Sequence, residues 1–432
     1  MREVTMTRYT GLNIRNNIAD INVLRDALRA SMKGSAWKRE PQAFAHNWLA
    51  ELSKLKKELQ TQTYKTMQGS EFTLNERGKI RHIHGGRMRD RIVRHALCDE
   101  IITPCMLPYL IHNNGASQSG KGLSFARREF ERDLHNYWLK HKSNKGYIAF
   151  VDLTKFYDNI QHGKVKELLF PIIPQEHHWL IDEILHNMEV DVSYMTDSEY
   201  ESCLDCKFDS VAYYAANHPK SGEKMMPKSM NIGDQLSQNI GVFFPYRIDN
   251  YVKIVRGVKY YGRYMDDIYF ICETLEEALS IVDGITEQAE KLGLFVNHHK
   301  TYIAKLSDTY KYLQIKYRLT DTGKVIKRIN PKSVTRERGR LKAHKRLLDK
   351  GVLTFNDVKL AYKSWMGEYT KLMSKIQIKH MKSLFRSLFG KEIRWKRGLD
   401  LRMVRKLSQR KTEVASSQQQ NRLFLLTYLL SQ

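Results

Sequence analysis

Residues 258–272 read VKYYGRYMDDIYFIC and place two adjacent aspartates, Asp266 and Asp267, between two apolar and aromatic runs. The β-branched and aromatic residues on both flanks predict the two strands of a hairpin, with the aspartates at its turn. Adjacent carboxylates between half-buried strands are unfavourable unless a cation neutralises them. Because Mg²⁺ is commonly bound by one or two carboxylates together with substrate phosphates, the stretch indicates a magnesium site. The alternative interpretation is an ordinary hairpin turn that contains aspartates.

A second stretch, GYIAFVDLTKFYDNI at residues 146–160, ends an apolar strand at Asp152. A carboxylate at the end of a buried strand is costly unless something binds it. The later Asp158 is expected to cap the following helix, but capping does not explain Asp152. Phosphoryl transfer with two metal ions requires carboxylates that converge from different strands. We therefore expect Asp152 to join Asp266 and Asp267 at one metal centre, although 114 residues separate Asp152 from Asp266.

The chain carries a large excess of basic residues. Lys and Arg number 72 against 47 Asp and Glu, which gives a formal net charge of +25 across 432 residues. Such an excess indicates a polyanionic partner, with nucleic acid favoured over an acidic membrane surface. Because the basic residues are spread along the chain, a long binding channel is favoured over a disordered arm. The length allows two or three domains.

Membrane insertion and secretion are not indicated by the sequence. No run approaches the roughly eighteen apolar residues of a membrane span, and the first residues lack the apolar core of a signal peptide. The five cysteines, an odd number, favour a reducing compartment. Cys203 and Cys206 form a CxxC pair that could supply half of a zinc site, but no second pair stands nearby.

The remaining patterns predict a helical start, a mixed central region and a basic helical end. For the first part we expect two helices in residues 13–62 with a basic loop at 31–41, a hairpin in 72–81, a helix at 87–106 and a polar, Gly-rich loop at 113–122. For the rest we expect an insertion at 190–230, helices at 233–243 and 274–292, strands at 310–317 and 324–328, and basic helices at 333–348, 354–375 and 380–389.

Four arginines crowd the start of the expected helix at 87–106, namely Arg87, Arg89, Arg91 and Arg94. Positive charge at a helix N-terminus opposes the helix dipole unless an anion lies nearby. The alternative is a solvated basic face. The loop at 113–122 could cradle phosphates through its backbone N–H groups, although it lacks the pattern of a Walker motif.

Five blocks in chain order resemble the ordered sequence blocks of reverse transcriptases: FVDLTKFYDNI, NIGDQLSQNIGVFF, YMDD, GLFVNHHKT and YLQIKY. The resemblance covers roughly residues 70–330. The upstream blocks RMRDRIVRHAL and NGASQSGKGLSFARR resemble those of bacterial retroelement enzymes, a group that includes diversity-generating, retron, group II intron and defence-associated types. The stretches ALRASMKGSAWKREPQAF and TGKVIKRINPKSVTRERGRLK are most similar to the diversity-generating type.

The resemblance implies an α+β right-hand polymerase fold, with fingers, a palm that contains an antiparallel sheet, a helical thumb and a helical N-terminal extension. The implied boundaries are 1–66 for the extension, 67–145 for the fingers, 146–310 for the palm with its insertion near 190–230, 311–330 for the primer-grip strands, and 331–432 for the basic helical thumb and C-terminal tail.

The resemblance also implies roles for individual residues. Asp152 and Asp266 ligate metal directly, and Asp267 is partly structural. Tyr157 takes the place of the steric gate against a ribose 2′-hydroxyl, with a core aromatic as the alternative. Lys300 matches the proposed general acid for pyrophosphate, with a solvated surface lysine as the alternative.

Further implied contacts concern the nucleotide and the nucleic acid. Gln238 lies against the incoming nucleotide and template base, and Tyr312 and Leu313 support the primer end. Lys121, Arg89 and Arg91 meet the triphosphate or template. Two departures are evident: Gln118 stands where relatives often carry Arg, and IGDQLSQ lacks a Pro before its last Gln. On the basic helix at 333–348, Arg336 and Arg340 share one face that follows the template–primer duplex, with a solvated face as the alternative.

The implied function is an RNA-directed DNA polymerase that makes cDNA with two Mg²⁺ ions, for which Mn²⁺ is a possible substitute. The expected partners are an RNA template, a DNA or RNA primer, dNTPs, a dedicated non-coding or template-repeat RNA of a bacterial retroelement and a possible accessory protein, without a membrane. The expected location is the cytoplasm, for a bacterial or phage-encoded protein. One alternative is a defence-associated enzyme that makes self-primed or template-independent DNA against phage. Another is a catalytically unused RNA-binding protein, against which the intact Asp152, Asp266 and Asp267 argue.

Overall fold

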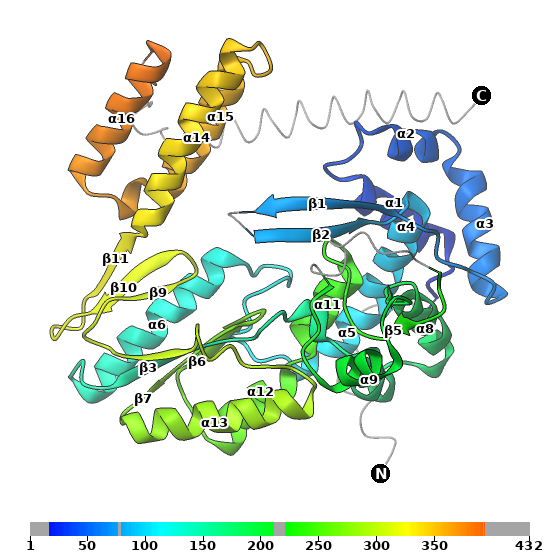
Figure 1. The fold of residues 1–432 in the computed structure, drawn as a ribbon, viewed down its shortest axis with the longest axis horizontal. Helices are drawn as coiled ribbons and strands as arrows, with labels where there is room; N and C mark the ends of the chain where they lie inside the picture. Colours follow the sequence, from blue (N-terminus) through cyan, green and yellow to red (C-terminus); the bar gives the residue numbers. More distant parts are fainter. Residues whose placement is uncertain (1–16, 77–78, 211–220, 392, 394–432) are drawn as a thin grey trace. The chain divides into compact units, whose positions relative to one another are not determined.

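The computed structural model describes residues 17–76, 79–210, 221–391 and 393 (Figure 1). The chain divides into two compact units, residues 1–327 and 328–432, and each has its own hydrophobic core. Parts of four predicted features lie outside the described residues: 1–16 of the N-terminal extension, 77–78 of the hairpin turn, 211–220 of the insertion, and 392 with 394–432 of the C-terminal region.

A four-stranded antiparallel sheet with the order β6-β7-β3-β8 lies in the first unit, with α6 and α13 on opposite sides of it (Figure 1). Its strands are β3 (Tyr147–Asp152), β6 (Tyr261–Tyr264), β7 (Asp267–Cys272) and β8 (Tyr302–Lys305). Residues 148–151 of β3 are all buried, as expected for an apolar strand with neighbours on both sides. The strands that flank the adjacent aspartates form the hairpin that the sequence predicts.

Helices and two-stranded sheets make up most of the remaining first unit. The helices are α1 (Ile21–Met32), α2 (Arg39–His46), α3 (Trp48–Gln60), α4 (Met88–Leu97), α5 (Thr103–Met106), α6 (Leu123–His141), α7 (His162–Leu169), α8 (His178–His186), α9 (Asp197–Asp205), α11 (Gln235–Phe243), α12 (Tyr246–Asn250) and α13 (Leu275–Lys291). The two-stranded sheets are β1 (Ser70–Glu76) with β2 (Lys79–Gly85), and β4 (Val190–Asp191) with β5 (Met225–Met226).

The two faces of the central sheet pack against different partners because side chains alternate along each strand. Ala149 on one face joins the core that α13 shares with the sheet. Phe150 and its cross-strand neighbour Tyr269 lie on the other face. There the ring of Phe130, from α6, lies 4.8 Å from the Tyr269 ring and stacks on Tyr312 at 4.5 Å. An aromatic cluster therefore covers this second face.

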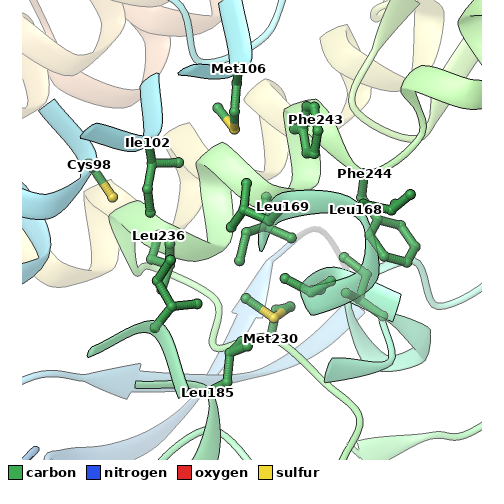
Figure 2. Packing of buried hydrophobic residues seen from close by; sticks show 14 of the residues in the cluster. Cys98, Ile102, Met106, Leu168, Leu169, Leu185, Met230, Leu236, Phe243 and Phe244 are labelled. Carbon is green, nitrogen blue, oxygen red and sulfur yellow. The ribbon is translucent and has the colours of Figure 1, made fainter. Parts of the chain in front are cut away.

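The helix α11 passes through the largest core of the first unit (Figure 2). Leu236 and Phe243 of α11 are buried among Ile102 and Met106 from the preceding helical segment and Leu169 of α7. The predicted helix at 233–243 is confirmed with a slightly later start, because the Asp234 side chain caps it by accepting a hydrogen bond from the Leu236 backbone N–H at 2.8 Å.

Two helix predictions in the N-terminal half are wrong in detail. The described part of residues 13–62, which starts at residue 17, contains three helices instead of two, because α2 begins at Arg39 inside the expected basic loop. The expected helix at 87–106 is interrupted by a π-helical turn, Cys98–Ile102, before α5. Pro104 follows this turn and lacks the N–H that a regular α-helix needs, so the backbone hydrogen-bonding pattern changes just before it.

The predicted strand at 310–317 is also wrong, because the chain reverses inside it. The strands β9 (Tyr310–Tyr312) and β10 (Ile315–Leu319) form a hairpin, and β11 (Val325–Ile329) completes a three-stranded sheet. Leu313 and Gln314 at the turn have φ values of 42° and 71°, which residues other than Gly rarely adopt. The Arg127 guanidinium holds this turn by donating to the Leu313 carbonyl at 2.7 Å and 3.2 Å.

The expected capping role of Asp158 is wrong as well. The helix α7 begins at His162, and no side chain caps its N-terminus. Asp158 lies in a 3₁₀ turn, Tyr157–Asn159, and its carboxylate accepts a hydrogen bond from the Ser210 hydroxyl at 2.6 Å. Asn159 likewise accepts a hydrogen bond from the Phe208 backbone N–H at 2.8 Å. These residues thus anchor the insertion at 190–230.

The described part of the second unit consists of α14 (Pro331–Asp349), α15 (Phe355–Tyr369) and α16 (Lys375–Phe389) around buried Leu341, Tyr362 and Phe385. The predicted helices at 354–375 and 380–389 have different boundaries, because Ser374 starts a new helix through a capping box with Gln377. Across the described ranges of both units, helices with the length and apolar content to cross a membrane are absent.

Asp133 of α6 is a buried carboxylate beside the central sheet. It accepts hydrogen bonds from the Tyr269 hydroxyl at 2.8 Å and from the Asn113 side-chain amide at 3.2 Å. Burial raises the pKa of Asp133 from 3.8 to about 6, and the hydrogen bond from Tyr269 opposes that increase.

Asp133→Asn should therefore alter how stability depends on pH. Between pH about 4 and about 6 the unfolded carboxyl loses its proton while the folded one keeps it. The free energy of unfolding of the wild type should fall with rising pH across this window, by up to about 3 kcal/mol relative to the variant, and then level off. Urea unfolding at a series of pH values measures this, with Asp283→Asn, at an exposed position of α13, as the control. A difference that does not vary with pH would contradict the raised pKa.

Candidate active site

Three aspartates gather at one end of the central sheet. Asp152 at the end of β3 lies directly opposite Asp267 at the start of β7. Residues paired in an antiparallel ladder project from the same face, so both carboxylates lie on the face that carries Phe150 and Tyr269. Asp266 occupies the two-residue turn that joins β6 to β7. The structure thus places the three carboxylates that the sequence selects at the same end of the sheet, although their oxygen atoms do not all lie within 4.8 Å of one another.

The three negative charges are costly at this position, because like charges directly opposite each other destabilise a sheet. Loss of hydration, with repulsion from Asp266 and Asp152, raises the pKa of Asp267 to about 7, although part of this residue remains exposed to solvent. Lys300 partly compensates, because its ammonium nitrogen lies 2.7 Å from the Asp152 carboxylate. A set of three carboxylates is the hard oxygen donor set that suits Mg²⁺.

A buried ion pair holds the turn that carries Asp266. The Arg263 guanidinium, from β6, is fully buried and donates to the Asp249 carboxylate of α12 at 2.6 Å and 2.8 Å. It also donates to the Met265 carbonyl at 3.2 Å and to the Val242 carbonyl at 2.8 Å. Met265 has a φ of 57°, a conformation that a side chain such as Met rarely adopts without support. Arg263 therefore links the strained turn to α11 and α12.

The edge strand β6 is covered by the start of the polar loop at 113–122. The Arg263 backbone N–H donates to the Asn113 carbonyl at 3.1 Å, and the Gly115 N–H donates to the Arg263 carbonyl at 3.0 Å. The Gly115 N–H therefore serves the sheet edge and is not available to the phosphate cradle considered for this loop. Lys121, from the same loop, donates to the His112 carbonyl at 2.9 Å, and burial lowers its pKa.

A cavity of about 660 Å³ lies beside the aspartate turn, and Asp266 lines it, whereas Asp152 and Asp267 are not among its lining residues. Of the residues selected from the sequence, Tyr157, Asp266 and Lys300 line it. Sequence reasoning missed Arg81 of the β1–β2 hairpin and Lys207 of the insertion, which also line the cavity. Neither stands in a distinctive motif, so only the packing of distant segments places them here.

The Tyr157 side chain is held between α11 and the aspartate turn. Its hydroxyl lies 3.8 Å from the Met265 sulfur. A methyl group added at Gly241 of α11 would lie 2.8 Å from the Tyr157 hydroxyl oxygen, so the glycine provides room for the ring. Burial and the negative charge of Asp266 raise the pKa of Tyr157 to about 12, and the hydroxyl stays protonated at neutral pH.

Several predicted contacts do not lie at this cavity. Gln238 is exposed on α11, and Lys121 is absent from the residues that line the cavity. The Tyr312 ring is buried against Phe130, so it supports the β9–β10 hairpin from within the core, while Leu313 lies at the turn itself.

Three of the arginines at the start of α4 bind groups of the protein itself. Arg89 pairs with Glu58 of α3, Arg91 donates to the Ser31 carbonyl of α1, and Arg94 pairs with Asp234 at the start of α11. Glu58 and Asp234 thus supply the anions expected near this helix, and Arg91 binds a backbone carbonyl. The contact of Arg89 and Arg91 with a triphosphate or template stays a prediction.

In the second unit, Arg336 and Arg340 are both exposed on α14. Arg336 donates to the Ser333 hydroxyl at 3.3 Å, whereas Arg340 pairs with the buried Glu337 at 2.8 Å. Burial raises the pKa of Glu337, and Arg340 opposes this effect. Arg340 therefore has a structural role as well as an exposed charge.

Residues 74–317, more than half of the chain, match the family model described as reverse transcriptase (RNA-dependent DNA polymerase). The matched region contains the three aspartates, Tyr157 and Lys300. No curated protein matches the sequence. The family that the sequence blocks predict is thereby confirmed.

Arg263→Met should destabilise the protein by about 3–5 kcal/mol, because it leaves the Asp249 carboxylate buried without its cation. The double variant Arg263→Met with Asp249→Asn removes that charge and should recover a large part of the loss. Urea unfolding of the wild type and both variants measures the effect. Equal stability of the single variant and the wild type would show that the pair does not support the turn.

Proposed function

Because the chain belongs to the reverse transcriptases, which are RNA-directed DNA polymerases, we propose that Asp152, Asp266 and Asp267 form its catalytic centre. An enzyme of this family takes an RNA template, a primer and dNTPs as substrates. The observation that carries the proposal is the convergence of three carboxylates from two strand ends and a turn, beside a cavity lined by Lys300. In this assignment, Asp152 and Asp266 bind metal directly, and Asp267 completes the site.

Reverse transcriptases generally use divalent metal ions, typically Mg²⁺. The site proposed here fits two Mg²⁺ ions, with Mn²⁺ as a substitute, because its donors are hard carboxylate oxygens whose mutual repulsion a cation would relieve. When bound, the ions supply activation of the primer 3′-hydroxyl and charge stabilisation of the triphosphate.

The neighbouring cationic side chains act on the triphosphate in this proposal. Lys300, which pairs with Asp152 at 2.7 Å, would deliver a proton to the leaving pyrophosphate oxygen. Arg81 and Lys207 line the same cavity and provide positive charge for the phosphates. They replace Lys121, whose ammonium group is engaged with the His112 carbonyl.

Tyr157 acts as the gate that excludes a ribose 2′-hydroxyl. Its ring forms part of the cavity wall and is fixed by Gly241 on one side and Met265 on the other. Gln238 contacts the template–nucleotide pair from the exposed side of α11, and the Leu313 turn contacts the primer.

On the fold, we propose that residues 146–310, which contain the central sheet and α13, form the palm. Residues 67–145, which contain the β1–β2 hairpin and α4 to α6, form the fingers, and α14–α16 form the thumb. The proposed template is a dedicated non-coding or template-repeat RNA of a bacterial retroelement. The support is the similarity of the upstream sequence blocks, together with a net charge of +25 that suits a structured RNA. In the thumb, Arg336 and Arg340 contact the duplex backbone.

Asp266→Asn should lower dNTP incorporation on an RNA template by several orders of magnitude, while RNA affinity stays near that of the wild type, because only the metal site changes. Primer extension with Mg²⁺ and RNA binding by fluorescence anisotropy measure the two properties. Asp283→Asn, at an exposed position of α13, is the matched control and should retain full activity. Undiminished synthesis by Asp266→Asn would refute the proposed centre.

Tyr157→Val should increase the use of rNTPs relative to dNTPs by at least about tenfold, or about 1.4 kcal/mol of discrimination, because the ring no longer meets the 2′-hydroxyl. The ratio of kcat/KM values for matched rNTP and dNTP measures this. Tyr194→Val, at an exposed tyrosine of the insertion, serves as the control. If the ratio stays at the wild-type value, Tyr157 is a core aromatic and not the gate.

A further inference from the structure

The β1–β2 hairpin carries a glutamate and two histidines on one face. Glu71 of β1 lies directly opposite His84 of β2, and His82 lies opposite Thr73, two residues along β1 from Glu71. Residues that are paired, or that lie two apart on a strand, share a face, so the three side chains project together. They are partly shielded, with side-chain exposures of 33% for Glu71, 9% for His82 and 22% for His84.

The distances among these side chains suit shared coordination better than direct hydrogen bonding. The His82 Nε2 and His84 Nδ1 atoms each lie 3.5 Å from a carboxylate oxygen of Glu71. That separation exceeds the donor–acceptor distance of a normal hydrogen bond. Two ligand atoms bound to one tetrahedral zinc ion lie about 3.4 Å apart, given bond lengths of about 2.0–2.2 Å. One potential ligand atom from each residue lies within 4.8 Å of the other two.

We propose that Glu71, His82 and His84 form a zinc site that is separate from the aspartate centre. Two imidazoles and one carboxylate supply three protein ligands, the number that leaves one coordination position for water or a substrate group. Nitrogen donors favour zinc and related transition metals, whereas the carboxylates of Asp152, Asp266 and Asp267 favour Mg²⁺. Within the described part of the chain, no other three His, Cys, Asp or Glu residues place one ligand atom each within 4.8 Å of the other two. Cys203 and Cys206 therefore do not belong to such a cluster.

The site would tie the two strands of the hairpin together. These strands form a sheet of only two strands, an arrangement that is marginally stable by itself, and Phe72, Leu74 and Ile80 on it are exposed. A metal ion that bridges Glu71 to the two histidines crosslinks β1 to β2. Because His82 and His84 also line the cavity beside Tyr157 and Asp266, the bound metal would stiffen one wall of that cavity.

Zinc binding to the full chain tests the proposal without relying on polymerase activity. The host protein carries Asp266→Asn, and excess Mg²⁺ occupies the remaining carboxylate sites. Isothermal titration with Zn²⁺, and the visible spectrum after Co²⁺ is bound in its place, report stoichiometry and geometry. One zinc ion per chain and a tetrahedral Co²⁺ spectrum are expected. Hydrogen exchange of the β1 and β2 amides should slow when zinc is added.

Variants of each ligand locate the site. His82→Ala and His84→Ala should abolish zinc binding, and Glu71→Gln should weaken it. His112→Ala is the matched control, because His112 lies 3.7 Å from Glu129 as a simple histidine–carboxylate pair, and it should bind zinc as the host does. His82→Asn keeps a polar side chain of similar size and serves where His82→Ala fails to fold.

Three results would overturn the proposal. The first is a lack of zinc binding by the host protein in excess Mg²⁺. The second is unchanged binding after His82→Asn and His84→Ala. The third is loss of zinc on Cys203→Ser with Cys206→Ser but not on substitution of the histidines, which would assign the metal to the CxxC pair.

Discussion

Repulsion among three carboxylates at one end of the central sheet is the constraint on which the rest of the structure depends. Asp152 and Asp267 face each other across a strand pair, an arrangement that a sheet tolerates only when other groups offset the charge. The buried apolar residues of β3 fix the strand register, and that register sets the two carboxylates side by side. Lys300 supplies a nearby positive charge from the loop after α13. The protein thus uses the stability of its core to hold a charge cluster that is unfavourable by itself.

A second set of buried polar contacts transmits this rigidity to the turn. The Arg263–Asp249 ion pair is fully shielded from water, and the same guanidinium donates to the Met265 and Val242 carbonyls. The position of the turn is therefore fixed relative to α11 and α12, which pack in the largest core. Gly241 on α11 provides the space in which Tyr157 lies against Met265. The positions of the aspartate turn and of the tyrosine are consequently set by the same helix.

The strongest local patterns predicted the structure well, whereas weaker ones did not. The hairpin around Asp266, the apolar strand before Asp152 and the helix after Gly233 are each supported by a continuous pattern of apolar residues and turn residues. The strand at 310–317 was mispredicted because its turn uses Leu313 and Gln314, two residues with no preference for positive φ, and is held by Arg127 from a distant helix. Asp158 lacks its expected capping role because Ser210, 52 residues away, offers it a buried hydrogen bond.

The sequence by itself determined the family, through its ordered sequence blocks, and the mixed helix and sheet class. It also selected the three aspartates as candidates, because carboxylates beside apolar strands are a local signal that requires explanation. Only the tertiary structure decided which cationic side chains reach the cavity. Arg81 and Lys207 come from segments with no distinctive motif. In the conspicuous basic cluster, by contrast, Arg89 forms an ion pair with Glu58 and Arg91 donates to the Ser31 carbonyl. It also decided that the Tyr312 ring is core and that Glu71 meets His82 and His84. The physical reason is that long charged and aromatic side chains take their partners from the packing of distant segments, which local spacing along the chain does not encode.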